Sequence, residues 1–256
     1  MLKQQLIALK TIVRVEIFRF LRVWMQSLMP PVVTIVLYFL VFGHFIGPHL
    51  QIQSGLTYMQ FIVPGLVMMA VVMNSYNNAA FAFFMTRFQR SIEEMLVSPM
   101  DFHILLLGFS LASITRGLLT GVIVTLVSFL FTHELPQHIG ILFLSAILAA
   151  ILFSLLGFLN GIFAKKFDDI STVPTFILTP LIYLGGVFYS IQQLPHVWQI
   201  ASYFNPITYL VSLFRYGFVG LQTINLFYGV IILIIINVLL YSANMFLLKR
   251  GVGIRT

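Results

Sequence analysis

Residues 139–163 read Ile-Gly-Ile-Leu-Phe-Leu-Ser-Ala-Ile-Leu-Ala-Ala-Ile-Leu-Phe-Ser-Leu-Leu-Gly-Phe-Leu-Asn-Gly-Ile-Phe, a stretch without a charged side chain. A helix crosses the roughly 30 Å hydrocarbon core of a bilayer in about 20 residues. The stretch is therefore long and apolar enough to predict a transmembrane helix. Lys165 and Lys166 follow it and mark one of its ends.

Five further apolar stretches of similar length lie on either side of it, at residues 23–46, 61–85, 104–131, 171–189 and 223–248. Hydrophobic residues make up 60% of the chain and charged residues only 8%, against roughly a quarter in soluble domains. A soluble fold could not cover its surface with so few charges. The sequence predicts an all-α membrane protein with six transmembrane helices in a domain that covers 23–256.

The basic residues fall on alternating sides of these stretches. Twelve of the 14 Lys and Arg residues lie in segments 1–22, 86–103, 164–169 and 249–256, and the connections between them hold almost none. Positive charge stays on the cytoplasmic side during insertion. We therefore expect a multi-pass membrane protein with both termini in the cytoplasm. Because membrane spans disperse the basic residues, they form no face for nucleic acid.

The segment 1–22 differs from the six spans, because it combines apolar and basic residues. Five apolar side chains share one narrow arc of a helix and three basic ones share the adjoining arc: Leu6, Leu9, Val13, Ile17 and Phe20, and Lys3, Lys10 and Arg14. This pattern predicts an interfacial helix along the inner leaflet, in contact with membrane lipids. An ordinary cytoplasmic flank is the alternative.

Residues within the spans predict kinks and close packing. Pro30 and Pro31 remove backbone donors in the first span and predict a kink there. The second span carries three asparagines, which are costly in hydrocarbon unless they face other helices or water. Three Gly-x-x-x-Gly spacings, which permit close helix packing, begin at Gly43, Gly117 and Gly157.

The segment 190–222 is too long for a loop without secondary structure. Leu194, Val197, Ala201 and Phe204 repeat at helical spacing, and the pair at 205–206, Asn-Pro, is typical of the start of a second helix. Neither helix could cross a bilayer. We expect a re-entrant helical hairpin that dips into the outer leaflet before the last span.

The chain lacks the motifs of the common catalytic sites. No phosphate-binding loop, Ser/His/Asp pattern or H-E-x-x-H motif is present. All seven acidic residues lie outside the predicted spans, which argues against an ion-driven transporter. Five histidines fall near the outer boundary, where loop positions are more common than a metal site: His44, His49, His133, His138 and His196. We predict neither a metal site nor enzymatic activity.

Two arginines fall in otherwise apolar segments. Arg116 lies within 104–131, and its side chain could snorkel to the inner boundary or contact a substrate. Arg215 lies in the predicted hairpin, where we expect it to anchor the hairpin to lipid headgroups.

The connection at residues 86–99 combines charge with an apolar stripe. Two arginines and two glutamates surround Phe88, Ile92 and Met95 at helical spacing, and Pro99 ends the segment. A charged amphipathic helix on the cytoplasmic side could dock a soluble partner. A solvated loop that obeys the positive-inside rule fits the composition equally well.

Four motifs spread over most of the chain resemble one family. They are Phe-Ile-Val-Pro-Gly-Leu (61–66), Ser-Ile-Glu-Glu-Met-Leu-Val-Ser-Pro (91–99), Thr-Pro-Leu-Ile-Tyr-Leu-Gly-Gly-Val-Phe-Tyr (179–189) and Asn-Pro-Ile-Thr-Tyr-Leu-Val-Ser-Leu-Phe-Arg-Tyr-Gly (205–217). The set resembles the ABC-2 type transporter permeases. Many members have a Ser-Gly pair where this chain has Gly185-Gly186.

The resemblance implies the permease fold and a half-transporter. Two permease chains, as a homodimer, would pair with two copies of a separate ABC ATP-binding subunit. That subunit would bind ATP and Mg²⁺, and this chain would hold no cofactor. The pair would export a hydrophobic or amphipathic substrate, such as a drug, a lipid or a lipid-linked glycan. An ATP-independent membrane assembly or lipid-scrambling protein is the alternative.

The resemblance also implies roles for individual residues. Coupling to the ATPase would use Arg87, Arg90, Glu93, Glu94 and Leu96. The translocation path would be lined by spans two and five, with Asn74, Asn77, Asn78, Phe176, Tyr183 and Phe188. The hairpin at 190–220 would form the outer gate, with Asn205, Pro206 and Arg215.

Overall fold

The computed structural model describes residues 2–47, 56–98, 100–132 and 135–253, and this part of the chain contains helices and no strand. The long helices are α1 (Leu2–Arg22), α2 (Trp24–Tyr38), α3 (Tyr58–Phe88), α5 (Phe102–Thr132), α6 (Ile139–Phe163) and α11 (Leu226–Lys249). The shorter ones are η1 (Phe39–Ile46), α4 (Ser91–Val97), α7 (Phe167–Val173), η3 (Pro174–Leu178), α8 (Thr179–Leu184), η4 (Ile191–Gln193), α9 (His196–Tyr203) and α10 (Pro206–Val219). The all-α prediction is confirmed.

Five helical segments in the described residues are long and apolar enough to cross a membrane. They are Trp24–Gly43, Tyr58–Phe88, Phe102–Thr132, Ile139–Phe163 and Leu226–Lys249, and they agree with five of the six expected spans. The sixth, expected at 171–189, is divided among α7, η3 and α8 and ends at Leu184. Gly185 and Gly186 end it, because Gly186 adopts a left-handed backbone with φ of 74°.

Helix α3 lies at the centre of the bundle and packs against α5, α6 and α10. Glycines make the close approach possible. A Cβ atom on Gly157 of α6 would collide with the backbone oxygen of Tyr76, and one on Gly117 of α5 would collide with Ser75 Oγ. These two Gly-x-x-x-Gly pairs therefore pack inside the chain, against α3.

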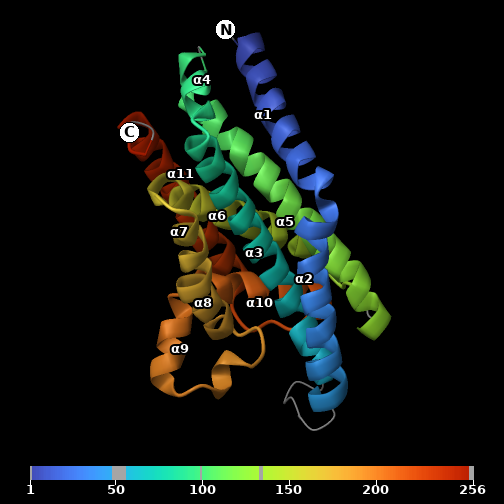
Figure 1. Ribbon diagram of the computed structural model, residues 1–256. Helices are drawn as coiled ribbons and strands as arrows, with labels where there is room; N and C mark the ends of the chain where they lie inside the picture. Colours follow the sequence, from blue (N-terminus) through green and yellow to red (C-terminus); the bar gives the residue numbers. More distant parts are fainter. Residues whose placement is uncertain (1, 48–55, 99, 133–134, 254–256) are drawn as a thin grey trace.

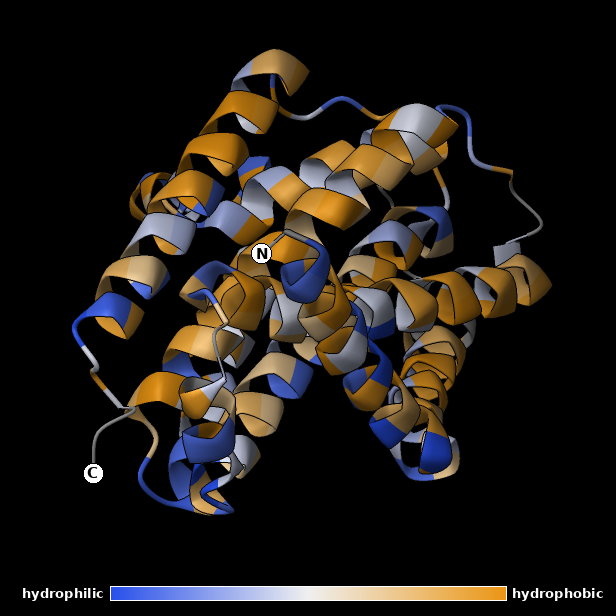
Figure 2. Ribbon diagram, turned by 90° about the horizontal axis from the view of Figure 1, so that it is seen from above, coloured by the Kyte–Doolittle hydropathy of each residue, from blue (hydrophilic) through white to orange (hydrophobic). Residues whose placement is uncertain are grey.

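The two ends of the bundle differ (Figure 1). Both marked termini and α4 lie at one end, and α9 lies at the other. Seen along the bundle, hydrophobic residues predominate along the helices, including those at the periphery (Figure 2). This distribution fits helices that face lipid.

Helix α1 packs along α5, as Gln5 Oε1 accepts a hydrogen bond from the Asp101 backbone and Ile12 sits against Gly108. Its buried face is formed by Ile12, Glu16 and Phe20, whereas Leu6 is exposed. Leu6, which belongs to the apolar arc described above, therefore does not pack against the bundle, and the interfacial position of this helix stays a prediction. The face of α1 that packs against α5 is a neighbouring arc, and it includes the Glu16 carboxylate.

The break near the start of the first span does not lie at its prolines. Helix α2 continues through Pro30 and Pro31, and the chain leaves helical geometry at Val23, between α1 and α2.

Candidate functional site

Helix α4 is a separate short helix at the end of α3. The chain reverses at Arg90, whose left-handed backbone has φ of 59°. Ser91 Oγ donates a hydrogen bond to the Thr86 carbonyl oxygen at 3.1 Å, which ties the new helix to the last turn of the old one. The helical alternative for residues 86–99 is confirmed over Ser91–Val97.

Ile92 and Met95 anchor α4 to the bundle, and its two acids lie in solvent. Ile92 is buried in a cluster with Ile12 of α1 and Phe158 of α6. Glu93 and Glu94 are exposed, and Val97 at the end of the helix is 87% exposed. The arrangement presents two carboxylates and an apolar tip at the end of the bundle that carries both termini. The side chain of Leu96, another expected coupling residue, lies outside the described residues.

Arg87 fastens α3 to the end of α6. Its Nη1 atom donates to the carbonyl oxygens of Gly161 and Ile162, both at 2.7 Å, and of Ala164 at 3.2 Å. The last carbonyls of a helix have no partners within it and carry partial negative charge. The guanidinium supplies both a hydrogen-bond donor and a positive charge to these carbonyls. Arg87 therefore has a structural role that was not predicted from its position in a charged loop.

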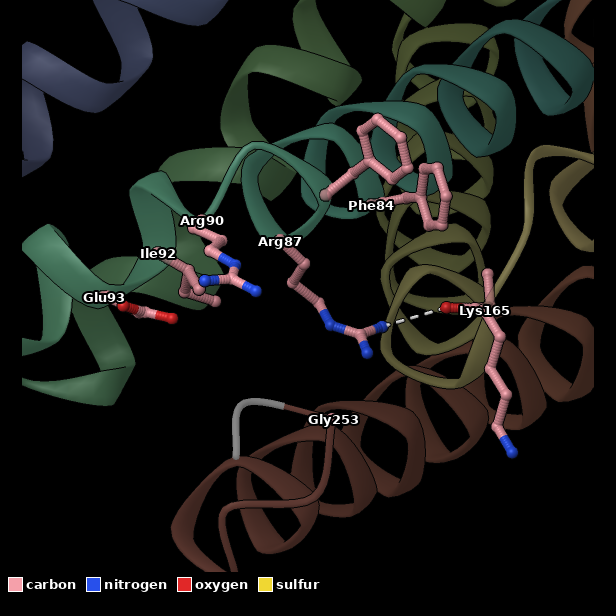
Figure 3. A pocket seen from close by; sticks show the side chains of 9 residues that line it. Phe84, Arg87, Arg90, Ile92, Glu93, Lys165 and Gly253 are labelled. Carbon is pink, nitrogen blue, oxygen red and sulfur yellow. Dashed lines mark hydrogen bonds between the residues drawn. The ribbon is translucent and has the colours of Figure 1, made fainter. Parts of the chain in front are cut away.

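A cavity of about 300 Å³ lies beside α4. It is lined by Phe84, Arg87, Phe88, Arg90, Ile92, Glu93, Ala164, Lys165 and Gly253. Figure 3 shows the guanidinium groups of Arg87 and Arg90 turned toward the same space, whereas the Lys165 ammonium points away. The cavity thus joins the α3–α4 turn, the end of α6 and the C-terminal segment.

The three asparagines of α3 do not share one face. Asn74 and Asn78 are buried, and Asn77 is exposed. Asn74 Nδ2 donates to the Ala70 carbonyl oxygen at 2.9 Å, and Asn78 Nδ2 donates to Ser113 Oγ at 2.9 Å. Only Asn77 is therefore available to a molecule outside the chain, because the other two amides are used inside the bundle.

The exposed side of α3 carries a stripe of residues three or four apart, a spacing that places side chains on one helix face. Its members are half-buried or exposed: Met69, Met73, Asn77, Phe81, Met85 and Phe88. This stripe was not predicted above, although the three- and four-residue spacing of its members is visible in the sequence. We call this set the α3 stripe.

Three expected path residues come from the segment after α7. Phe176 is 74% exposed, Tyr183 is exposed, and Phe188 is half-buried. The rings of Tyr183 and Phe188 stack with centroids 5.5 Å apart, and Phe188 also contacts Phe42 at 5.4 Å. These aromatic residues form an apolar surface at the part of the bundle near α8.

The family model for ABC-2 type transporters matches residues 7–219. The chain belongs to the ABC-2 type transporter family. It is 48% identical to the inner membrane transport permease YadH of Escherichia coli K12, over 98% of each chain. It is 24% identical to nodulation protein J of Rhizobium leguminosarum bv. trifolii, over 84% of this chain and 82% of the relative.

In this ABC-2 type chain, the segment expected to form a re-entrant hairpin contains two helices, α9 and α10. Asn205 Oδ1 accepts from the Ile207 backbone at 3.0 Å, its Nδ2 donates to the Leu181 carbonyl oxygen at 2.6 Å, and Pro206 starts α10. The helix start expected at 205–206 is confirmed. Helix α10 then packs in the core against α6 and α3. In α9, by contrast, Val197 and Phe204 are largely exposed.

Arg215 does not reach lipid headgroups, and that expectation is wrong. Its side chain is only 3% exposed. The guanidinium donates to the carbonyl oxygens of Phe61 at 3.2 Å and Gly186 at 2.8 Å, and lies 3.8 Å from the centre of the Phe61 ring. The Gly186 carbonyl follows the end of α8 and requires a hydrogen-bond donor from another part of the chain. Arg215 supplies that donor only in the folded protein.

Arg116 also bonds inside the protein. It donates to Asn78 Oδ1 at 3.2 Å and to the Ser27 carbonyl oxygen at 3.0 Å. The guanidinium is turned to the neighbouring helices α2 and α3, so the expectation that it snorkels to the boundary is wrong.

No group of metal-binding side chains occurs among the residues that the structure describes. Of the five outer histidines, His49 and His133 lie outside the described residues, as does the side chain of His44. His138 stacks on Tyr216 with ring centroids 4.8 Å apart. That ring has a packing role.

Proposed function

We propose that this chain is the permease subunit of an ATP-driven ABC exporter in a bacterial inner membrane, with both termini in the cytoplasm. Helix α4 carries the proposal. It presents Glu93 and Glu94 to solvent at the end of the bundle that holds both termini, and Ile92 fixes it to the core. A separate ATP-binding subunit would dock there, hold ATP and Mg²⁺, and use the two glutamates as contacts.

The connection of α4 to α3 supports a mechanism for coupling. Helix α3 has 31 residues and runs from the α4 turn through the centre of the bundle. When the ATP-binding subunits close, they would displace α4, and Arg87 would carry the displacement to the end of α6. Coupling requires that the two states of the partner make different contacts with α4.

The α3 stripe supports the position of the path. Methionine and aromatic side chains with a single amide at Asn77 suit a hydrophobic or amphipathic substrate. The exposed Phe176 and Tyr183 would complete the wall, and two permease chains as a homodimer would enclose the path between their α3 stripes. The buried Asn74 and Asn78 would then support the path from behind.

The hairpin would act as the outer gate. Because Arg215 and Asn205 hold α10 and its start in the core, we assign the moving part to α9. Its exposed apolar side chains would lie in the outer leaflet. The names of the relatives, a transport permease and a nodulation protein, agree with transport but do not identify a substrate.

The test is ATP hydrolysis by the purified complex in lipid nanodiscs. We expect the double variant Glu93→Lys/Glu94→Lys to insert normally but to lose permease-dependent stimulation of ATP hydrolysis. Asp168→Lys, which reverses an exposed acid of α7, is the control and should retain stimulation. Unchanged stimulation in the α4 variant would overturn the assignment.

A second arm addresses the alternative of an ATP-independent scramblase. Vesicles that contain the permease without an ATP-binding subunit should show no sustained uphill flux and no lipid scrambling above empty vesicles. Scrambling in that arm would favour the alternative function.

A further inference from the structure

The cavity beside α4 contains more positive charge than the protein itself uses. Arg87 is bonded through Nη1 to the end of α6, and its Nη2 has no partner within the described residues. The Arg90 side chain makes no hydrogen bond or ion pair in that part of the chain. Both guanidinium groups face the same space above Gly253, and the Glu93 side chain, which points from α4 toward Arg90, adds one carboxylate to the lining (Figure 3).

The backbone of Arg90 is a second, independent observation. It is the non-glycine residue with positive φ among those described, at 59°. Helices commonly end on such a left-handed residue, which is usually glycine because a Cβ atom is unfavourable there. An arginine in this position costs stability, and its side chain makes no hydrogen bond or ion pair within the described residues. Such strain is a reason to look for a ligand.

The apolar side of the cavity indicates what kind of ligand fits. Phe84, Phe88 and Phe167 pack together, with ring centroids 5.0 to 5.8 Å apart. Phe88 is 60% exposed and Phe167 is 48% exposed. Exposed phenylalanine rings offer an apolar surface, which suits the acyl chains of a lipid.

The position of the cavity along the bundle agrees with the level of the lipid headgroups. Helix α3 has 31 residues and a length of about 46 Å, against about 30 Å for the hydrocarbon core. Its last turns, with Arg87, therefore extend into the headgroup layer. In the orientation proposed above, this layer belongs to the inner leaflet, whose anionic lipids attract basic residues.

We propose that this cavity binds the phosphate group of an anionic phospholipid of the inner leaflet. Arg90 and the free Nη2 of Arg87 would donate to the phosphate oxygens, and the acyl chains would lie along Phe88 and Phe167. Guanidinium groups match phosphate geometry and form strong charge-assisted hydrogen bonds with it. The lipid would thereby hold the α3–α4 turn, and with it the surface that docks the partner.

The inference uses the proposed orientation but not the coupling to ATP. We would test it with the permease alone, without an ATP-binding subunit, so that a failure leaves the transport proposal standing. The purified, delipidated protein is titrated with phosphatidylglycerol or phosphatidylcholine, and the lipids retained are counted by native mass spectrometry. We expect preferential retention of phosphatidylglycerol.

Arg90→Gln should reduce that retention about tenfold, the scale of one lost charge-assisted hydrogen bond. Arg14→Gln, which removes an exposed charge of α1, is the matched control and should retain the lipid. Arg90→Gly separates binding from folding, because glycine relieves the left-handed backbone. It should lose the lipid while its melting temperature stays equal or rises.

Three outcomes would overturn the proposal. Equal retention of the two lipids, or equal loss in the Arg14 and Arg90 variants, would show general attraction to a basic surface. Displacement of the lipid by inorganic phosphate alone would show a site for a free anion. Normal lipid retention by Arg90→Gln would show that the lipid binds elsewhere on the protein.

Discussion

Arg116 of α5 donates through Nη2 to the carbonyl oxygen of Ser27 in α2 at 3.0 Å. In a regular helix this carbonyl would accept from the residue four positions later, which is Pro31 and has no N–H. The arginine therefore replaces a hydrogen bond that the proline removes. Its Nη1 atom reaches Asn78 of α3 at 3.2 Å, so one side chain joins three helices.

Loss of Arg116 should destabilise the bundle through that carbonyl. We expect Arg116→Met to lower stability by about 1.5–3 kcal/mol, the range for hydrogen bonds to a charged group. The measurement is thermal unfolding in detergent. Thr115→Ala, on the exposed side of the same turn, serves as the control and should change little. A melting temperature equal to that of the wild type would contradict the role.

A double-mutant cycle tests the link to Pro31 directly. Pro31→Ala restores an N–H that can bond to Ser27. In that background, Arg116→Met should cost clearly less than in the wild type, because the carbonyl no longer depends on the arginine. Strictly additive effects would show that the two residues act independently.

Gly157 and Gly140 offer a matched pair on α6. A Cβ atom on Gly157 would meet the Tyr76 backbone, whereas one on Gly140 would meet nothing within 4 Å. We expect Gly157→Ala to lower stability by about 1–3 kcal/mol through overpacking. Gly140→Ala should be neutral. Yield and melting temperature in detergent measure both, and equal behaviour would contradict the close approach of α3 and α6.

Two asparagines of α11 bind α6 in the same register, seven residues apart. Asn237 Nδ2 donates to the Leu148 carbonyl oxygen at 3.4 Å, and Asn244 Nδ2 donates to that of Leu155 at 3.1 Å. Polar contacts between membrane helices are worth about 0.6 to 2 kcal/mol. Asn244→Leu should cost about 1 kcal/mol in chemical unfolding and Asn237→Leu less, because its contact is longer. A larger loss of stability for Asn237→Leu than for Asn244→Leu would contradict this interpretation of the two distances.

Arg87 should matter for folding before it matters for coupling. Arg87→Gln removes a charge from three carbonyls, and we expect a loss of about 1.5–3 kcal/mol with faster amide hydrogen exchange near residues 161–166. Arg22→Gln, an exposed arginine of α1, is the control. Unchanged exchange at the end of α6 would leave Arg87 as a contact for the partner alone.

The hydrophobic pattern determined the positions of most helices. Helix α6 runs over Ile139–Phe163, as expected, because the length of an uninterrupted apolar stretch is a local property of the chain. The start of α10 was also predictable, because Asn205 caps the helix and Pro206 fits its first position, and both effects are local. For the loop at residues 86–99 the sequence left a helix and a solvated loop open, and the structure decided for the helix.

Tertiary structure alone decided which face of each helix is buried and what its polar residues bind. Helix α3 is apolar on nearly all sides, so its sequence does not tell Asn77, which is exposed, from Asn78, which is buried. Arg116 and Arg215 bind carbonyls that lost their partners at Pro31 and after α8. Distant segments come together only in the folded chain. Within the bilayer, where no water is present, a charged side chain then donates to a nearby carbonyl that has no other partner.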